Sequence, residues 1–182
     1  MRAAAIFLLL AAACDTTPTV GGHRQPPPAV VAPPDQWQGV RVLAVTPPDN
    51  WTTDLELQYT NWFRAVIMAY LERKGFETVP LPVIHRSMRK WKFTLAGELA
   101  LFRPSELCQE WKCDAIVCWD ILRDGQLSFS CIKADGTMLW ASGPRRLEPV
   151  YNIVVDSPLT SQHRTFSVTI CECLRDFPRR GP

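Results

Sequence analysis

Three short apolar runs in the second half of the chain constrain its fold more than any other feature. The runs, at 114–122, 127–133 and 137–142, are rich in β-branched and aromatic residues. Asp124-Gly125 and Asp135-Gly136 separate them, and Asp-Gly is a dipeptide that tight hairpin turns prefer. We therefore predict three antiparallel strands in a meander, one face of which must be buried against another layer.

The elements expected before the meander alternate between strand and helix. Residues 39–46 form a β-branched run stopped by two prolines, which is typical of a buried strand. A helix follows that Thr53 or Asp54 can cap, with apolar side chains at three- and four-residue spacing until Gly75 ends it. The next expected elements are a strand at 76–80, a helix at 83–92, a helical or irregular stretch at 94–102 and a helix at 105–111.

The C-terminal segment is expected to be a helix. Ser157-Pro158 is a helix-start signal, and Phe166, Ile170 and Leu174 then share one helical face. The alternative is a strand, because Phe166, Val168 and Ile170 also alternate.

Together these elements predict an α/β (α+β) fold with a single domain at 39–177 and a tail at 178–182. Its mixed sheet would carry the antiparallel C-terminal meander and pack against helices.

The N-terminus has the pattern of a signal peptide at residues 1–13. Arg2 is followed by a run without polar side chains from 3 to 13. Eleven apolar residues in a helix reach roughly 16 Å, against about 30 Å for the hydrocarbon core of a bilayer. The run is therefore too short to span a membrane.

The end of this run, Ala11-Ala12-Ala13-Cys14, resembles the lipobox of bacterial lipoproteins. The resemblance implies that Cys14 is the lipid attachment site, and several acyl chains on one cysteine would anchor the protein stably to a membrane. It also implies a cell-envelope location facing the periplasm, with the choice of inner or outer membrane left open. The alternative is cleavage by ordinary signal peptidase at the same bond, which would leave Cys14 a free thiol.

Residues 14–38 are expected to be the lipidated cysteine and a proline-rich tether. Six prolines and few large apolar residues lie between 15 and 38, a composition that favours extended conformations over a packed core. Fully extended, this segment would hold the domain up to roughly 70 Å from the membrane.

Charge and motifs exclude several function classes. The net charge is only +2, so no long-range field would attract nucleic acid. No cysteine lies in a hydrolase signature beside a histidine, so we expect no catalytic residue. Cys171 and Cys173, even with His163, lack the spacing of structural zinc sites, and phosphate-loop glycines are missing. We therefore expect neither metal nor cofactor.

Three of the tryptophans are candidates for a partner surface. Trp37, Trp51 and Trp91 lie in or near polar segments, whereas Trp62 belongs to the apolar face of its expected helix. Burial in the core is the more frequent fate of a tryptophan. The pair Arg145-Arg146 is most simply read as solvated charge.

The first hairpin predicts a cross-strand disulfide between Cys118 and Cys131. If Asp124-Gly125 is a two-residue loop, these cysteines face each other in a non-hydrogen-bonded pair, with Cα atoms about 4.5 Å apart. An envelope location would supply the oxidising compartment. The alternative is two buried free thiols, and a bulge or a longer loop would turn the two side chains apart.

Four segments carry a resemblance to a known group of proteins. They are the strand at 41–45, the helix end and strand start at 70–77, the strand start at 113–117 and the segment 133–140. Over 39–176 the chain resembles bacterial lipoproteins with a compact α/β domain. This group includes the lipoprotein activators of penicillin-binding proteins, the curli-secretion lipoprotein and neisserial-type lipoproteins. The resemblance implies a binding or assembly module with no active site to carry over.

The function expected from these observations is that of a lipid-anchored envelope lipoprotein. It would bind a periplasmic protein partner in the assembly or regulation of an envelope machine, and homo-oligomerisation is left open. The alternative is a small periplasmic enzyme or ligand-binding protein acting on cell-wall or peptide substrates. A large concave pocket with titratable groups would favour that alternative, whereas an apolar surface patch would favour a protein partner.

Overall fold

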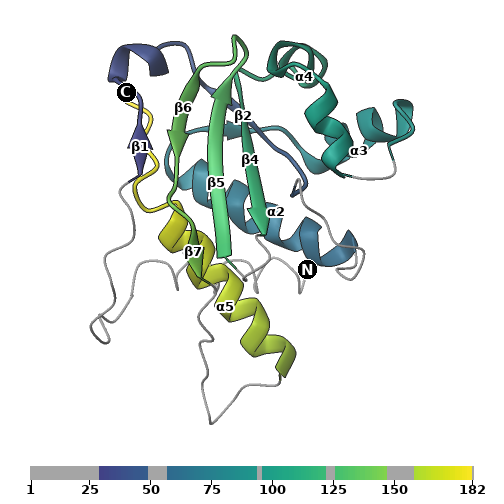
Figure 1. Cartoon of the computed structure of the whole chain (residues 1–182), viewed down its shortest axis with the longest axis vertical. Coiled ribbons are helices and arrows are strands. Elements are labelled where there is room, and N and C mark those ends of the chain that lie inside the picture. Colours follow the sequence, from purple (N-terminus) through teal and green to yellow (C-terminus); the bar gives the residue numbers. More distant parts are fainter. Residues whose placement is uncertain (1–28, 49–56, 94–95, 122–125, 147–157, 182) are drawn as a thin grey trace.

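A computed structural model describes residues 29–48, 57–93, 96–121, 126–146 and 158–181 (Figure 1). The predicted signal peptide, Cys14 and the first part of the tether lie outside the described residues. The strands are β1 (Val30–Val31), β2 (Val42–Val45), β3 (Glu77–Thr78), β4 (Ala115–Ile121), β5 (Gln126–Lys133), β6 (Met138–Ala141) and β7 (Arg145–Arg146). The helices are α2 (Leu57–Arg73), α3 (Leu81–Lys90), α4 (Pro104–Trp111) and α5 (Pro158–Cys173), with 3-10 turns η2 (Pro34–Trp37) and η3 (Ala96–Leu101).

Within the described residues the strands form one seven-stranded mixed sheet in a single domain. Its order is β1-β6-β5-β4-β2-β3, and β7 pairs with the start of β5. The predicted meander is confirmed, because β5 pairs antiparallel with both β4 and β6. Strand β2 lies between β3 and β4 and is parallel to both. The α/β class with a mixed sheet is therefore as predicted.

Helices cover the two faces of the sheet unequally. Side chains of α2 and α5 share one core cluster with strands β2, β4, β5 and β6. A second, smaller cluster joins α3, η3 and α4 to β2 and β4 on the opposite face. In Figure 1, α3 and α4 stand beside β4 and leave the front of β5 and β6 bare. We call the front of β5, β6 and β1 the open face.

The periodicity of α2 and its end at Gly75 are confirmed. Phe63, Ile67 and Leu71 are all buried at spacings of four residues. Gly75 has φ 95°, a left-handed conformation that suits glycine. The N–H of Phe76 then donates to the carbonyl of Leu71 at 3.2 Å and closes the helix.

The C-terminal segment is a helix, and the strand alternative is wrong. Ile170 and Leu174 are fully buried in the main core. Phe166, one turn earlier, stacks on Phe63 of α2 with ring centroids 4.3 Å apart. Helical spacing therefore sends these side chains to one side, towards α2 and the sheet.

The prediction that the tether extends to residue 38 is wrong at its C-terminal end. Val30 and Val31 pair with Ala141 and Trp140 of β6 and form an edge strand. The ring of Trp37 packs on those of Phe76 and Phe177, at 6.0 and 5.5 Å between centroids. A two-residue strand has no periodicity to detect, so only the presence of β6 identifies these residues as part of the domain.

The predicted Cys118–Cys131 disulfide is also wrong. Cys118 pairs with Ser130, and Cys131 pairs with Val117. The last pair before the turn is Ile121 with Leu127, one residue out of register with the pairing that a two-residue loop at Asp124-Gly125 would give. A shift of one residue turns a side chain to the other face, and the two thiols lie in different core clusters.

The prediction that Arg145 and Arg146 are merely solvated needs correction too. They form β7, in which Arg146 pairs with Gln126 and Arg145 with Leu127. Arg145 is half-buried. The charge of these residues gave no sign of a strand, because the pairing depends on where β5 begins.

Removing β1 and η2 should destabilise the domain, whereas removing the chain before them should not. We expect a chain starting at residue 39 to unfold at a lower denaturant concentration than one starting at residue 29. The shorter chain lacks β1, the outer neighbour of β6, and it also lacks the Trp37 ring in the core. The single change Trp37→Ala should cost about 2 kcal/mol, since the side chain is half-buried. Urea unfolding followed by tryptophan fluorescence and circular dichroism measures both effects, and equal midpoints for the two truncations would contradict the new domain boundary.

Candidate functional site

A buried arginine occupies the carboxyl end of β2. Arg64 of α2 is only 1% exposed. Its Nε and Nη2 donate to the carbonyl oxygen of Val45 at 3.1 and 2.9 Å. Its Nη1 lies 2.9 Å from Nε2 of His85 on α3. Because arginine only donates, Nε2 accepts and the His85 ring carries its proton on Nδ1.

The protonation states of this pair follow from burial. Burial lowers the pKa of Arg64 to about 10, so its guanidinium stays charged at neutral pH. Burial lowers the pKa of His85, and the nearby charges of Arg64 and Arg89 lower it further. A neutral His85 is therefore the natural acceptor for Arg64, and together they link α2, α3 and β2. One feature of the sequence could have indicated this cluster: Arg64 is a charged residue within the apolar face of α2.

The carboxyl ends of parallel strands are where open α/β sheets commonly bind ligands. In this protein the space beside β2 and β4 is occupied by the protein's own groups. Besides Arg64, the indole N–H of Trp119 donates to the carbonyl of Thr46 at 2.7 Å, and the N–H of Thr46 donates to Val117 at 3.1 Å. Among the described residues, this end of the sheet is thus a packed and hydrogen-bonded structural element.

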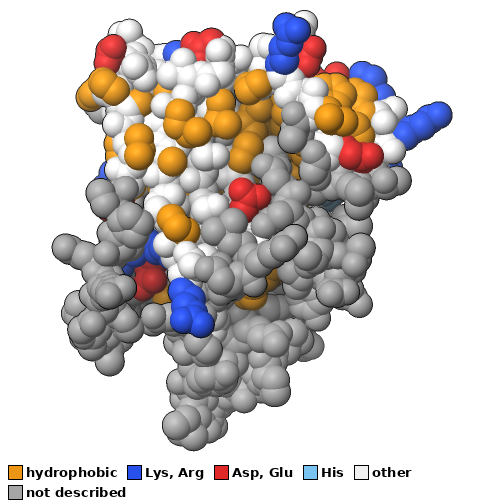
Figure 2. Space-filling view, in the orientation of Figure 1, with side chains coloured by type: hydrophobic (Ala, Val, Ile, Leu, Met, Phe, Trp, Pro, Cys, Tyr) orange, Lys and Arg blue, Asp and Glu red, His pale blue; other side chains and the backbone are white. Residues whose placement is uncertain are grey.

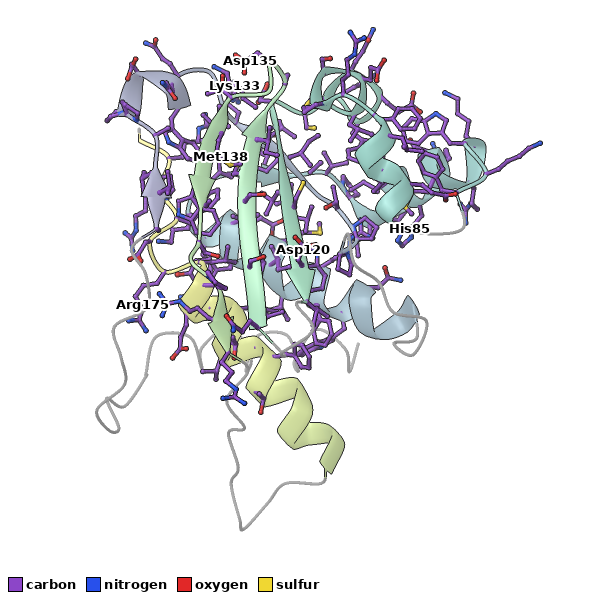
Figure 3. The ribbon with its side chains drawn as sticks, viewed as in Figure 1. His85, Asp120, Lys133, Asp135, Met138 and Arg175 are labelled. Carbon is purple, nitrogen blue, oxygen red and sulfur yellow. The ribbon has the colours of Figure 1, made fainter. Side chains whose placement is uncertain are left out.

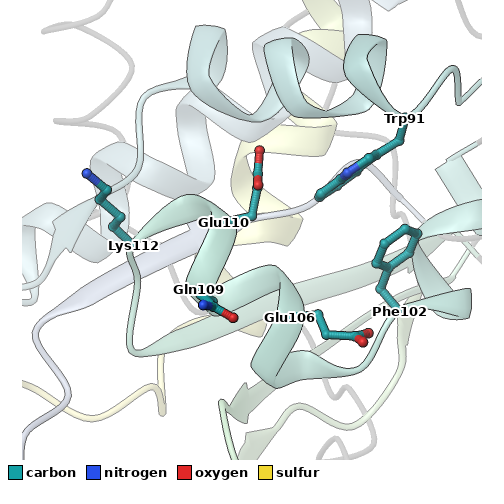
Figure 4. Close-up of a pocket in the computed structure, with 6 residues that line it drawn as sticks. All are labelled: Trp91, Phe102, Glu106, Gln109, Glu110 and Lys112. Carbon is teal, nitrogen blue, oxygen red and sulfur yellow. The ribbon is translucent and has the colours of Figure 1, made fainter.

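A shallow hollow of about 530 Å³ lies beside α4 (Figure 4). Its lining residues are Trp91, Phe102, Glu106, Gln109, Glu110 and Lys112. The ring of Trp91 stacks on that of Phe102 with centroids 4.7 Å apart, and it also touches Phe93 and Trp111. Trp91 is therefore half-buried in an aromatic cluster and is only in part the surface residue that we predicted.

Both carboxylates of the hollow already have partners. Glu110 accepts from Lys90 at 3.2 Å and from Ser87 at 3.0 Å, and these hydrogen bonds lower its pKa. Glu106 accepts the backbone N–H of Arg103 at 2.9 Å, which caps α4. Glu110 is therefore ionised at neutral pH and poorly suited to donate a proton, and Glu106 serves the helix end.

The open face combines apolar and small polar side chains. Along β5, Leu127, Phe129 and Cys131 point into the main core, so the alternate residues, Ser128 and Ser130 among them, point to the open face. Hydrophobic side chains gather across the upper part of this face (Figure 2). Figure 3 places Met138 and Asp120 on the strands of this face, and Lys133 and Asp135 at the turn above it.

The edge of the open face is apolar. Val30 is 63% exposed, Val31 48% and Met138 of the neighbouring strand 45%. The N–H of Ala32 donates to Leu139 at 2.8 Å. Because hydrogen-bonded and non-bonded pairs alternate in an antiparallel ladder, the N–H and C=O of Val31 point away from β6, towards the outside of the sheet.

Trp37 and Trp91, two of the predicted surface tryptophans, lie in different parts of the structure. Trp37 belongs to the edge of the main core and Trp91 to the second cluster, while Trp51 lies outside the described residues, as does Cys14. The described residues contain no group of three or more His, Cys, Asp or Glu side chains placed to hold a metal ion. Nor does any helix among them have the length and hydrophobicity needed to cross a membrane.

Comparisons with known proteins give structural neighbours only. No protein-family model matches the chain, and no curated protein matches it. The solved lipoprotein GNA1162 from Neisseria meningitidis is 20% identical, with a TM-score of 0.48 over 56% of this chain and 78% of that chain. A PelC dodecamer from Paraburkholderia phytofirmans is 12% identical, with a TM-score of 0.48 over 85% of this chain and 97% of that chain.

The stability of the domain should depend on the protonation of His85. Its pKa is lower in the folded state than the usual value of about 6.5, so below that value the unfolded chain binds more protons. We expect the free energy of unfolding to be constant above pH 7 and to decrease as the pH falls below about 6.5. In His85→Gln, whose side-chain oxygen can still accept from Arg64, this decrease should be absent. Urea unfolding between pH 5.5 and 7.5 measures it, and identical pH profiles for the two proteins would refute the role of His85.

Proposed function

We propose that this chain is a lipid-anchored lipoprotein of the bacterial cell envelope whose domain binds a protein partner in the assembly or regulation of an envelope machine. The apolar run before Cys14 supports the anchor. The observation that carries the binding function is the apolar outer edge of the sheet at β1.

The two edges of the sheet differ in a way that supports this role. At β3, the exposed side chains of Glu77 and Arg41 form an ion pair at 3.4 Å, and charges of this kind discourage strand addition. At β1, Val30 and Val31 are exposed instead. Within the described ranges, that edge is protected by the shortness of β1 and by the prolines that follow it.

The occupant that fits this edge is an extended, apolar segment of a partner protein. Such a segment would extend the sheet by pairing with the outward N–H and C=O of Val31, as in β-strand addition. Alternate side chains of the added strand would then meet Val30 on the open face or Val31 on the opposite face. An acidic or basic peptide would gain less, because this edge presents apolar side chains.

The corrected domain boundary also determines how far the partner stands from the membrane. Fifteen residues separate Cys14 from β1, and fully extended they would reach about 45 Å. The partner segment is therefore expected within that distance of the lipid, rather than within the longer reach of a tether extending to residue 38.

The features of the described pockets favour a binding module over an enzyme or a receptor for small molecules. A catalytic or ligand site needs polar groups that point into a concave space and can still form hydrogen bonds with a ligand. The hollow beside α4 is shallow, and its carboxylates already accept hydrogen bonds from Lys90, Ser87 and Arg103. We therefore propose no enzymatic activity.

The anchor is tested at Cys14. The change Cys14→Ser should abolish the incorporation of labelled palmitate and release the protein from washed membranes, because no acyl chain is then attached. Cys118→Ser, at a cysteine within the domain, is the control and should keep both properties. Wild-type protein that is unlabelled and washes off the membrane would establish the ordinary secreted form instead.

The docking edge is tested by site-specific photocrosslinking in intact cells. A photoreactive residue at position 30 should give an adduct with another envelope protein, and the same residue at position 77 should not. Val31→Pro should abolish the adduct, because it removes the outward N–H of β1 without removing a hydrogen bond to β6.

Three results would count against this docking site. They are an adduct at both positions, an adduct that survives Val31→Pro, and an adduct of twice the mass of the chain. The last result would assign the edge to a second copy of this protein.

A further inference from the structure

Two cysteines meet where α4 turns into β4. Cys108 lies in the last turn of α4, and Cys113 directly precedes the Asp114-Ala115 start of the strand. The N–H of Cys113 donates to the carbonyl oxygen of Cys108 at 3.0 Å. This is the bond from the sixth to the first residue of a Schellman motif, which commonly ends helices.

That backbone hydrogen bond limits the distance between the two residues. Because it joins the nitrogen of one to the carbonyl oxygen of the other, standard bond lengths keep their Cα atoms within about 7 Å. Disulfides are found up to about this Cα separation. Both are free thiols in this structure, and the interaction between the two thiols lowers the pKa of Cys108 and raises that of Cys113.

The last of the four residues between them is held in an unusual backbone conformation. Lys112 has φ 54° and ψ 49°, the left-handed region, which costs a residue with a side chain roughly 1 kcal/mol. A covalent link across Lys112 would hold this conformation. Among the other described cysteines, Cys131 and Cys173 lie in the main core cluster on the opposite face of the sheet, whereas Cys118 packs against the same cluster as Cys108 and Cys113.

We propose that Cys108 and Cys113 are joined by a disulfide bond in the mature protein. This inference rests on the proposed envelope location, because disulfides form and persist in oxidising compartments. The bond ties the end of α4 to the start of β4. There the carboxylate of Asp114 accepts the N–H groups of Arg41 and Val42, each at 2.8 Å.

The bond forms by two thiol–disulfide exchanges with an oxidant of the protein disulfide class. The thiolate of Cys108 attacks one sulfur of the oxidant's disulfide, which breaks and releases one thiolate, giving a mixed disulfide. The thiolate of Cys113 then attacks the sulfur of Cys108 and displaces the second thiolate of the oxidant. Both protons and both electrons leave with the oxidant, which becomes a dithiol.

The products are the same if Cys113 attacks first. In the folded domain Cys108 is only 3% exposed and Cys113 8%, so the reaction takes place before α4 packs on the sheet.

Peptide mapping without reduction tests the bond. The full-length chain with Cys118→Ser is extracted from envelope membranes, and free thiols are blocked in denaturant before digestion with trypsin. Cleavage after Lys112 separates the two cysteines, so the bridge alone keeps their peptides together until a reductant is added. The Cys118 change leaves Cys113 as the sole cysteine of its peptide, which ends at Arg123. We expect the linked pair, and its loss in Cys108→Ser.

A second measurement separates this inference from the proposed location. The same full-length chain, reduced, unfolded and then refolded in a glutathione redox buffer, should form the same bridge whatever its cellular location. If both cysteines are blocked after refolding, the proposed geometry is wrong. If the bridge forms in the buffer but both thiols are blocked in the envelope sample, the disulfide of the mature protein is refuted, and palmitate labelling of Cys14 decides the location independently.

Discussion

The interior strand β2 is held at both ends by charged side chains, and the parallel part of the sheet depends on it. At its start, one oxygen of the Asp114 carboxylate accepts two backbone N–H groups, those of Arg41 and Val42, each at 2.8 Å. At its end, Arg64 donates twice to the carbonyl of Val45. Leu43, Ala44 and Val45 have no exposed surface, so water cannot hydrogen-bond to their backbone N–H and C=O groups. These contacts fix β2 between β3 and β4. The pairs β2–β3 and β2–β4 are the only parallel pairs among the described strands.

Because β2 is parallel to both of its neighbours, its connections must cross the sheet faces, and this makes the domain asymmetric. The helix after β2 covers one face together with α5, while α3 and α4 cover the other face near β2 and β4. The meander has no crossover helices, so the front of β5, β6 and β1 stays bare (Figure 1). Exposed apolar residues therefore concentrate where the chain adds short strands at the edge, and this is where we place the binding of a partner.

Several charged residues that could be taken for functional groups from the sequence alone instead hold elements of the fold together. Arg64 and His85 close the end of the sheet that many α/β proteins use for ligands. Glu106 caps α4, and Glu110 joins α3 to α4 through Lys90 and Ser87. Away from these engaged groups, the edge of the sheet at β1 offers exposed apolar side chains and outward backbone groups. That chemistry suits a protein segment better than a small polar substrate.

The sequence by itself determined the kinds of elements and their order, because those follow from local physics. Helical spacing predicted α2 and α5, Gly75 predicted the end of α2, and the Asp-Gly turns predicted the meander. Only the tertiary structure decided which residues face each other. Four features depend on groups that folding brings together. They are the register of β4 and β5, the inclusion of β1 and Trp37 in the domain, the contact of Arg64 with β2, and the proximity of Cys108 to Cys113. A register shift of one residue between β4 and β5 leaves the local pattern of either strand unchanged. For that reason the sequence predicted both strands but not the faces on which Cys118 and Cys131 lie.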